Sequence, residues 1–220
     1  MYWNGLVRIG AEKMKKYMDK LYDNLDEAKA FALSFTNFAY FYDDMSSWDF
    51  HTEICNVCKK TYQSYDYLAP RASCKKPTSI LHSLEFGVSE EVRNDLIEKF
   101  DITEEDFRPV RNKRGEIVYY QITPQHVMLP IHEENEWPQM DPCPCCGSIQ
   151  YGFHDYRNEK NEFYYYISQA ALDDMHDLNV SYEQFRFYMP MYIISRRLYD
   201  YLTELFPRTH YRPFYLKALE

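Results

Sequence analysis

Two pairs of closely spaced cysteines constrain the fold of this chain more than any other feature of its sequence. Cys55 and Cys58 form one C-x-x-C turn, and Cys143 and Cys146 form a second. Zinc takes four thiolate or imidazole ligands in a tetrahedron, and each C-x-x-C turn can present two sulfurs to one ion. Because residues 59–142 separate the two turns, a shared site joins distant parts of the chain. The spacing therefore predicts one structural zinc site with these four cysteines as its ligands.

The remaining ligand candidates leave alternatives open. Gly147 completes a C-P-x-C-G knuckle, because glycine permits the tight turn that follows the second pair. Cys145 lies inside that turn and could replace a neighbouring ligand, although its spacing from Cys143 is poorer. Cys74 lies among lysines and is expected to be a free thiol, and His51 is an alternative ligand. A redox role would require a thioredoxin-like strand–CxxC–helix context, which neither pair has.

One enzymatic alternative arises from the residues that precede the second pair. His132 and Glu134, followed by Pro142 and its cysteines, match the zinc-deaminase signature H-x-E then P-C-x-x-C. In a deaminase the two motifs begin separate helices with a strand between them, and residues 135–141 are too few for that. The sequence also has no HExxH motif, phosphate-binding glycine loop or nucleophile elbow. We therefore predict a protein that is not an enzyme.

Two segments repeat the same order of strand, serine cap and helix. Residues 86–100 carry this pattern around Ser89, and residues 192–206 carry it around Ser195. A serine can accept a backbone N–H at the start of a helix, and apolar residues four apart then bury one helical face. Both segments lead through an aromatic-Arg-Pro step into a further strand. Chance similarity is the alternative, but the shared order with the cysteine pairs favours an internal duplication.

These patterns predict an α+β fold with an N-terminal helical extension. Apolar residues at three- and four-residue steps predict a helix over 11–25, and a second helix is expected over 26–36, capped by Asn24 or Asp26. Tyrosine and β-branched residues predict strands, and Ser168 is expected to cap a helix that runs through Met175. These strands lie at residues 62–67, 116–122 and 163–167.

The predicted domain organisation follows from the polar break at 43–47. Residues 1–46 form the helical extension, and residues 47–220 form a zinc-binding α+β domain. Within that domain we expect two similar strand-helix-strand halves, at about 47–125 and 126–220, joined by the four-cysteine site of zinc-ribbon or zinc-knuckle type.

Charge and composition restrict the partners. The formal net charge of −9 disfavours nonspecific nucleic-acid binding, which depends on clustered Lys and Arg, and suits a basic protein partner. The acidic runs 103–106 and 132–136 are either solvated loops or contacts for such a partner, and His126 and His132 are expected at the solvated surface. A nucleic-acid-binding zinc-ribbon regulator is the alternative, with a local basic face built from Lys75, Lys76, Arg111, Lys113 and Arg114.

The expected location is the cytoplasm. The N-terminus lacks a basic region followed by an apolar stretch, and no apolar run approaches the roughly 18 residues of a membrane span. In a reducing compartment, clustered cysteines indicate metal ligands rather than disulfides.

The paired motifs resemble those of the double-CXXCG motif proteins. The resemblance rests on CNVC at 55–58 and CPCCG at 143–147 within strand–helix repeats, and it covers about residues 48–217. This chain has Lys59 where the first motif of the family has glycine. Many members of this bacterial family are considered immunity proteins of polymorphic toxin systems. The resemblance implies a cytoplasmic, noncatalytic, antitoxin-like protein that binds and neutralises a partner toxin, with zinc in a structural role.

Overall fold

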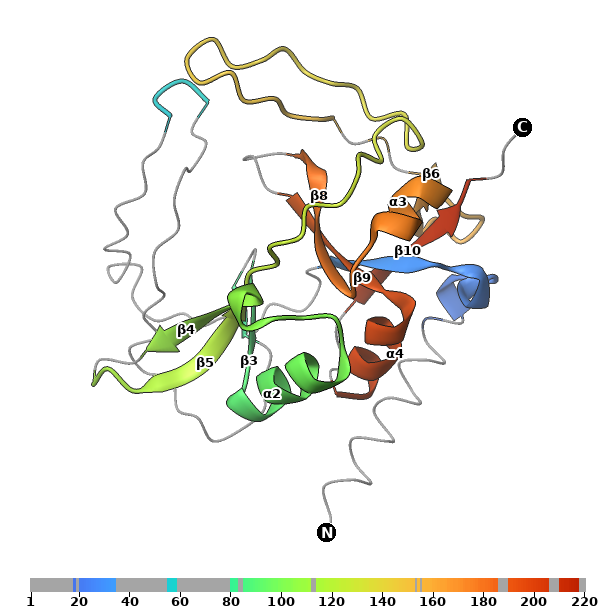
Figure 1. Ribbon diagram of the computed structural model, residues 1–220. Coiled ribbons are helices and arrows are strands. Elements are labelled where there is room, and N and C mark those ends of the chain that lie inside the picture. The colour runs from blue at the N-terminus through green and yellow to red at the C-terminus, as the bar shows by residue number, and fades with distance from the viewer. Residues whose placement is uncertain are drawn as a thin grey trace.

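Two β-sheets and a few helices form the framework of this α+β protein (Figure 1). The structure is a computed structural model. It describes residues 18, 20–34, 55–58, 80–82, 85–111, 114–152, 154, 156–185, 190–205 and 210–217.

The smaller sheet has the strand order β2-β3-β5-β4, and all its neighbouring strands are antiparallel. Its strands are β2 (Ile80–His82), β3 (Glu85–Val88), β4 (Phe107–Arg111) and β5 (Ile117–Ile122). Helix α2 (Glu90–Lys99) and the 3-10 turn η3 (Glu104–Asp106) connect β3 to β4. Because β5 lies between β3 and β4, these two strands run in the same direction.

The larger sheet has the order β6-β7-β10-β1-β9-β8, in which only the β7–β10 pair is parallel among the described strands. Its strands are β1 (Ala30–Ser34), β6 (Tyr156–Arg157), β7 (Phe163–Ile167), β8 (Leu178–Gln184), β9 (Pro190–Ser195) and β10 (His210–Leu216). Helix α3 (Gln169–Asp174) follows β7, and α4 (Arg196–Leu205) connects β9 to β10. Strand β1 lies between β9 and β10 and is antiparallel to both.

All three predicted serine caps are confirmed. Each serine Oγ accepts a hydrogen bond from the backbone N–H of the residue three positions later in the chain. The distances are 3.3 Å for Ser89, 3.2 Å for Ser168 and 3.1 Å for Ser195. Each such bond satisfies one of the N–H groups that a helix start leaves without a partner. The strands expected over 116–122 and 163–167 are also present, and the strand expected over 62–67 lies outside the described residues.

The second helix expected in the N-terminal extension is wrong. Of residues 26–36, the structure describes a 3-10 turn, η1 (Leu25–Glu27), and then strand β1 at the centre of the larger sheet. Ala30, Phe31, Ala32 and Leu33 are all buried, so this strand is covered on both faces. A strand buried on both faces has no alternating pattern to distinguish it from a helix, and the sheet pairing overrides the helix propensity of alanine. Met18, Lys20 and Leu21 are the described helical residues of the helix expected over 11–25.

Two hydrophobic clusters pack on opposite faces of the larger sheet. On one face, Phe31 stacks on Tyr199 of α4, and the same cluster includes Leu96 of α2 and Ile122 of β5. This cluster therefore includes residues of both sheets. Helices α2 and α4 lie side by side (Figure 1), and Tyr201 of α4 donates a hydrogen bond to Asp95 of α2. The second cluster, on the other face, contains Tyr165, Ile167 and Phe214 together with the apolar residues of segment 128–151.

The domain boundaries at residues 46 and 125 stay predictions. Strand β1, which belongs to the predicted extension, nevertheless lies inside the sheet formed by the C-terminal segment.

None of the helices in the described part of the chain has the length and apolar character needed to cross a membrane.

Candidate metal centre

The metal centre is built from two segments that are far apart in the sequence. Residues 55–58 form a turn, and residues 139–151 form a hairpin that reaches toward it at one corner of the molecule (Figure 1). A bridge between Gln139 and Tyr151 closes the hairpin, and the backbone N–H of Met140 donates to the Gln150 carbonyl at 2.8 Å. The ligand pair lies at the tip of this hairpin.

Backbone hydrogen bonds shape the tip. The Cys143 N–H donates to the Ser148 carbonyl at 2.9 Å, and the Gly147 N–H donates to the Cys143 carbonyl at 2.8 Å. Gly147 has a φ of +69°, which is the left-handed conformation that glycine adopts at little cost. The expected knuckle turn is therefore present.

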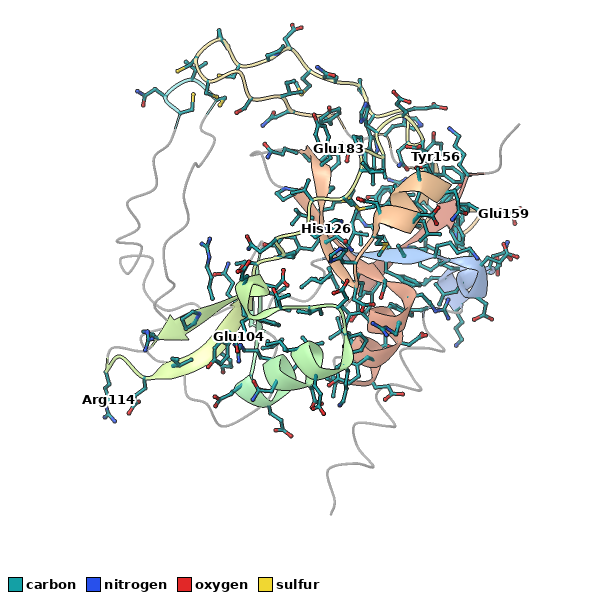
Figure 2. The ribbon with its side chains drawn as sticks, in the orientation of Figure 1. Glu104, Arg114, His126, Tyr156, Glu159 and Glu183 are labelled. Atoms are coloured by element: carbon teal, nitrogen blue, oxygen red, sulfur yellow. The ribbon has the colours of Figure 1, made fainter. Side chains whose placement is uncertain are left out.

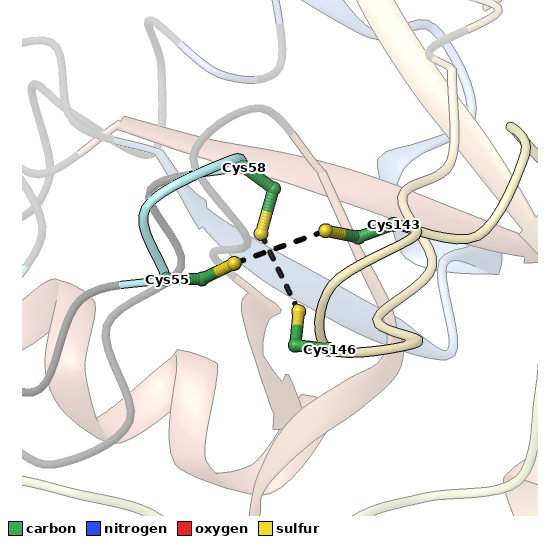
Figure 3. A group of neighbouring side chains, drawn as sticks. All are labelled: Cys55, Cys58, Cys143 and Cys146. Atoms are coloured by element: carbon green, nitrogen blue, oxygen red, sulfur yellow. Dashed lines mark hydrogen bonds between the residues drawn. The ribbon is translucent and has the colours of Figure 1, made fainter.

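The four predicted cysteines come together (Figure 3). The Sγ atoms of Cys55 and Cys143 are 3.8 Å apart, those of Cys58 and Cys146 are 3.5 Å apart, and all four lie within 4.8 Å of one another. A tetrahedral site with metal–sulfur bonds of about 2.3 Å has sulfurs about 3.8 Å apart. The four thiols are free rather than joined as disulfides, so the group could hold one metal ion.

The surroundings of Cys55 favour its thiolate form. Cys55 and Cys143 are buried, whereas Cys58 and Cys146 are half-buried. A hydrogen bond from the backbone of Cys58 lowers the pKa of Cys55, against the opposing effect of desolvation, and the backbone of Val57 adds to the lowering. Backbone N–H donors of this kind stabilise metal-bound thiolates. The Cys146 thiol donates a hydrogen bond to the Ser148 hydroxyl oxygen at 3.3 Å.

The alternative ligands are not among the four grouped cysteines or lie outside the described residues. Cys145 is exposed and is not one of the four grouped sulfurs, although it lies next to Cys55, whose pKa it helps to lower. His132 is also outside the group, because its Nδ1 is hydrogen-bonded to Glu183 Oε1 at 2.9 Å. Cys74 and His51 lie outside the part of the chain that the structure describes.

Glu183 and Asn135 hold the turn that leads into the metal hairpin, and sequence reasoning missed both. Glu183, on β8, is 0% exposed, and its Oε1 also accepts the backbone N–H groups of Ile131 and His132 at 2.7 and 2.8 Å (Figure 2). The Asn135 side chain donates to the Ile131 carbonyl and pairs with both backbone groups of Tyr166, each at 2.8 Å. The alternation of β8 groups Glu183 with Asn179 and Ser181 on its polar side, which the pattern alone would place toward solvent, so the local sequence carried no signal for the burial of Glu183.

The two histidines expected at the solvated surface are instead engaged. His132 bonds to Glu183, while the ring of His126 stacks on His176 at 4.0 Å and its Nε2 lies 3.4 Å from Asp174. The two imidazoles therefore belong to different contacts and do not form a common ligand pair.

The charged runs divide between structural and exposed roles. In the run 103–106, Asp106 is buried and accepts hydrogen bonds from the backbone N–H groups of Thr103 and Gln125, both at 2.8 Å, so it is not a solvated residue. Glu133 and Glu136 of the second run are exposed. Of the basic residues expected to form a local face, Arg111 and Arg114 belong to the β4–β5 hairpin, where Arg111 donates to the Gly115 carbonyl. Lys75, Lys76 and Lys113 lie outside the described residues.

Comparison of the chain with protein-family models, with curated proteins and with solved structures gave no match. The fold and the site together define an α+β protein in which four cysteines from two distant segments form a group that could hold a metal ion.

Proposed function

We propose that this chain is a cytoplasmic, noncatalytic zinc-binding protein in which the ion cross-links residues 55–58 to the hairpin 139–151. The observation that carries the proposal is the set of four converging Sγ atoms with near-tetrahedral spacing. A tetrahedral S4 set is typical of zinc or of iron–sulfur centres, and four protein ligands leave no open position for a reacting water. The ion then contributes folding free energy rather than chemistry.

The proposed biological role is that of an immunity or antitoxin-like protein that binds and neutralises a partner toxin. Its support is the resemblance to double-CXXCG motif proteins, together with the meeting of both motifs at one centre. The net charge of −9 suits a basic partner, since complementary charge accelerates association.

We further propose that the two sheets are built on one repeated unit joined through a zinc-ribbon-like site. In the smaller sheet β5 lies between β3 and β4, which α2 connects, and β2 pairs with β3. In the larger sheet β1 lies between β9 and β10, which α4 connects, and β8 pairs with β9. In the second unit the strand between β9 and β10 is β1, which precedes the rest of that unit in the chain. The second half would therefore include residues 30–34.

Metal analysis tests the structural part of the proposal. The purified protein is expected to contain about one zinc per chain, and Cys143→Ser is expected to lose most of it and to unfold at a lower temperature. Cys145→Ser is the matched control, because Cys145 is exposed, is not one of the four grouped sulfurs, and is replaced by a hydroxyl that can still donate to Cys55; both properties should stay unchanged. Less than half a zinc per chain in the unmodified protein, or equal zinc content in the two variants, would remove the basis of the proposal.

Affinity capture from the native host, followed by co-expression, tests the biological part. The captured protein should arrest growth when it is expressed alone and should lose that effect when this chain is co-expressed. If instead the chain binds DNA or RNA with an affinity that falls steeply with salt, the nucleic-acid-binding regulator replaces the immunity role.

A further inference from the structure

Four tyrosines form a continuous group on one face of the larger sheet, at its β6–β7–β10 end. We name this group the tyrosine row; it consists of Tyr156, Tyr164, Tyr166 and Tyr215. The strand register pairs Tyr156 with Tyr164 and Tyr166 with Tyr215. The ring centroids of Tyr156 and Tyr166 are 5.1 Å apart, and those of Tyr156 and Tyr164 are 5.9 Å apart. All four residues are half-buried.

The row differs from the face behind it. Tyr165 and Ile167 of β7 point to the opposite face, where they are fully buried with Phe214. Tyr164 and Tyr215 touch the edge of the core cluster on their own face, so the row continues that core outward to the surface. The Asn135 side chain already pairs with the backbone N–H and C=O of Tyr166. An additional strand therefore cannot pair with β7 at this residue, and a ligand must contact the row through side chains.

Exposed carboxylates lie at both ends of the row. Burial raises the pKa of Tyr156 and of Tyr215, and nearby carboxylates raise it further: Glu136 at Tyr156, and Glu27 and Asp23 at Tyr215. Asp23 is paired with Lys160, and the carboxylates of Glu136 and Glu27 outnumber the Lys217 ammonium that lies near Tyr166. A phosphate backbone would be repelled by these groups, whereas a cation would be attracted.

The row already carries one cation of its own. The Nζ atom of Lys217 lies 6.0 Å from the ring of Tyr166 and donates a hydrogen bond to the Glu134 carbonyl. Tyrosine faces attract ammonium and guanidinium groups, and tyrosines are frequent among the residues that dominate protein interfaces. The row lies away from the basic β4–β5 hairpin, since Figure 2 shows Tyr156 and Arg114 on opposite sides of the molecule.

We propose that the tyrosine row, bounded by Glu136 and Glu27, is the docking surface for a basic segment of the partner protein. Arg or Lys side chains of that segment stack on the tyrosine rings while the carboxylates hold their charge. This inference rests on the proposed function, because it assumes that the chain binds a protein partner; the tyrosine row is the surface through which that partner is bound.

A peptide assay tests the surface without the natural partner. The probe is a fluorescein-labelled peptide of alternating Arg and Gly, and the control probe alternates Glu and Gly at the same length. Binding is measured by fluorescence anisotropy, and NMR of tyrosine-ring-labelled, unmodified protein locates it. We expect saturable binding of the Arg peptide alone, with shifts concentrated in the four rings of the row.

Matched variants separate the aromatic contribution from the charge. Tyr166→Leu is expected to weaken binding about tenfold, while Tyr166→Phe, which keeps the ring, should bind as the unmodified protein does. Tyr182→Leu is the control for a tyrosine that is 51% exposed on β8. Glu136→Gln should weaken binding, and Glu159→Gln, at another exposed glutamate, should not.

The result that overturns the inference is no saturable binding, equal loss in Tyr182→Leu and Tyr166→Leu, or ring shifts outside the row. Because NMR uses the unmodified protein, a variant that fails to fold does not affect this decision. Peptide binding at the row without a captured toxin would refute the proposed function alone. A captured and neutralised toxin without peptide binding would refute the docking surface alone.

Discussion

Replacement of Glu183 by alanine should destabilise the turn that carries the chain into the metal hairpin. The carboxylate is completely buried and accepts three hydrogen bonds, two from the backbone N–H groups of Ile131 and His132 and one from the His132 ring. Ile131 is itself 0% exposed, so water cannot easily replace the lost acceptor. A buried donor without a partner costs about 1–3 kcal/mol. Because two backbone donors lose their acceptor, we expect the free energy of unfolding to fall by roughly 3–5 kcal/mol.

Urea unfolding of the zinc-loaded protein, followed by tryptophan fluorescence, measures this change, since Trp137 lies in the turn and is buried. Glu183→Gln keeps the acceptor at Oε1 but places an NH2 group at the position of Oε2, which is buried without a partner, and should cost about 1–3 kcal/mol. Glu133→Ala, at an exposed glutamate of the same turn, should change stability by less than about 0.5 kcal/mol. A Glu183→Ala loss no larger than that of Glu133→Ala would refute the reasoning that the buried carboxylate holds the turn.

Two further predictions concern a buried carboxylate and a glycine. Desolvation acts to raise the pKa of Asp177, but hydrogen bonds from Arg197, Ser195 and the Asp101 backbone hold it below its ordinary value. This stabilisation is therefore present above the unfolded pKa of about 3.9 and is lost as pH falls through the folded pKa. Asp177→Asn should be less stable than the unmodified protein by about 1–2 kcal/mol at pH 7, and this difference should shrink in acid. Urea unfolding at several pH values measures the difference. A stability difference that is constant from pH 7 to pH 2 would contradict this. Gly147→Ala places a β-carbon at a φ of +69° with no atom within 4 Å, so backbone strain alone should cost about 1 kcal/mol, whereas Gly147→Asn should cost less. Competition with a chromogenic chelator would detect the expected weaker metal binding, and equal affinities of the two variants would argue against strain as the cause.

Much of the local structure could be predicted because it depends on neighbouring residues. Ser89 and Ser195 sit where a helix start leaves N–H groups unpaired, and both accept such a group. The cysteine spacing likewise indicated which sulfurs could share one ion, and those four Sγ atoms lie within 4.8 Å of one another. A few adjacent residues carry the physical reason for each local feature, a serine at a helix start or a C-x-x-C turn that presents two sulfurs, whereas the meeting of the two turns depends on the fold.

The errors have a common cause in contacts between distant segments. Residues 30–34 have a run of alanines and apolar residues that suits a helix as well as a buried strand, and only pairing with β9 and β10 decides between them. His132 looked like a surface residue because its partner, Glu183, is 51 positions away in the chain. A buried carboxylate is stabilised by the donors that the fold brings to it, and local sequence does not specify them.

The sequence by itself thus determined the chemistry available at each position: paired thiols with a glycine turn, serines at helix starts, and an excess of carboxylates. Tertiary structure alone decided which of these groups meet. It placed β1 inside the larger sheet, brought two C-x-x-C turns to one point, and set Glu183 beneath the turn that leads to the second of them. The physical reason is that spacing along the chain sets local geometry, whereas burial and long-range pairing depend on how the whole chain packs.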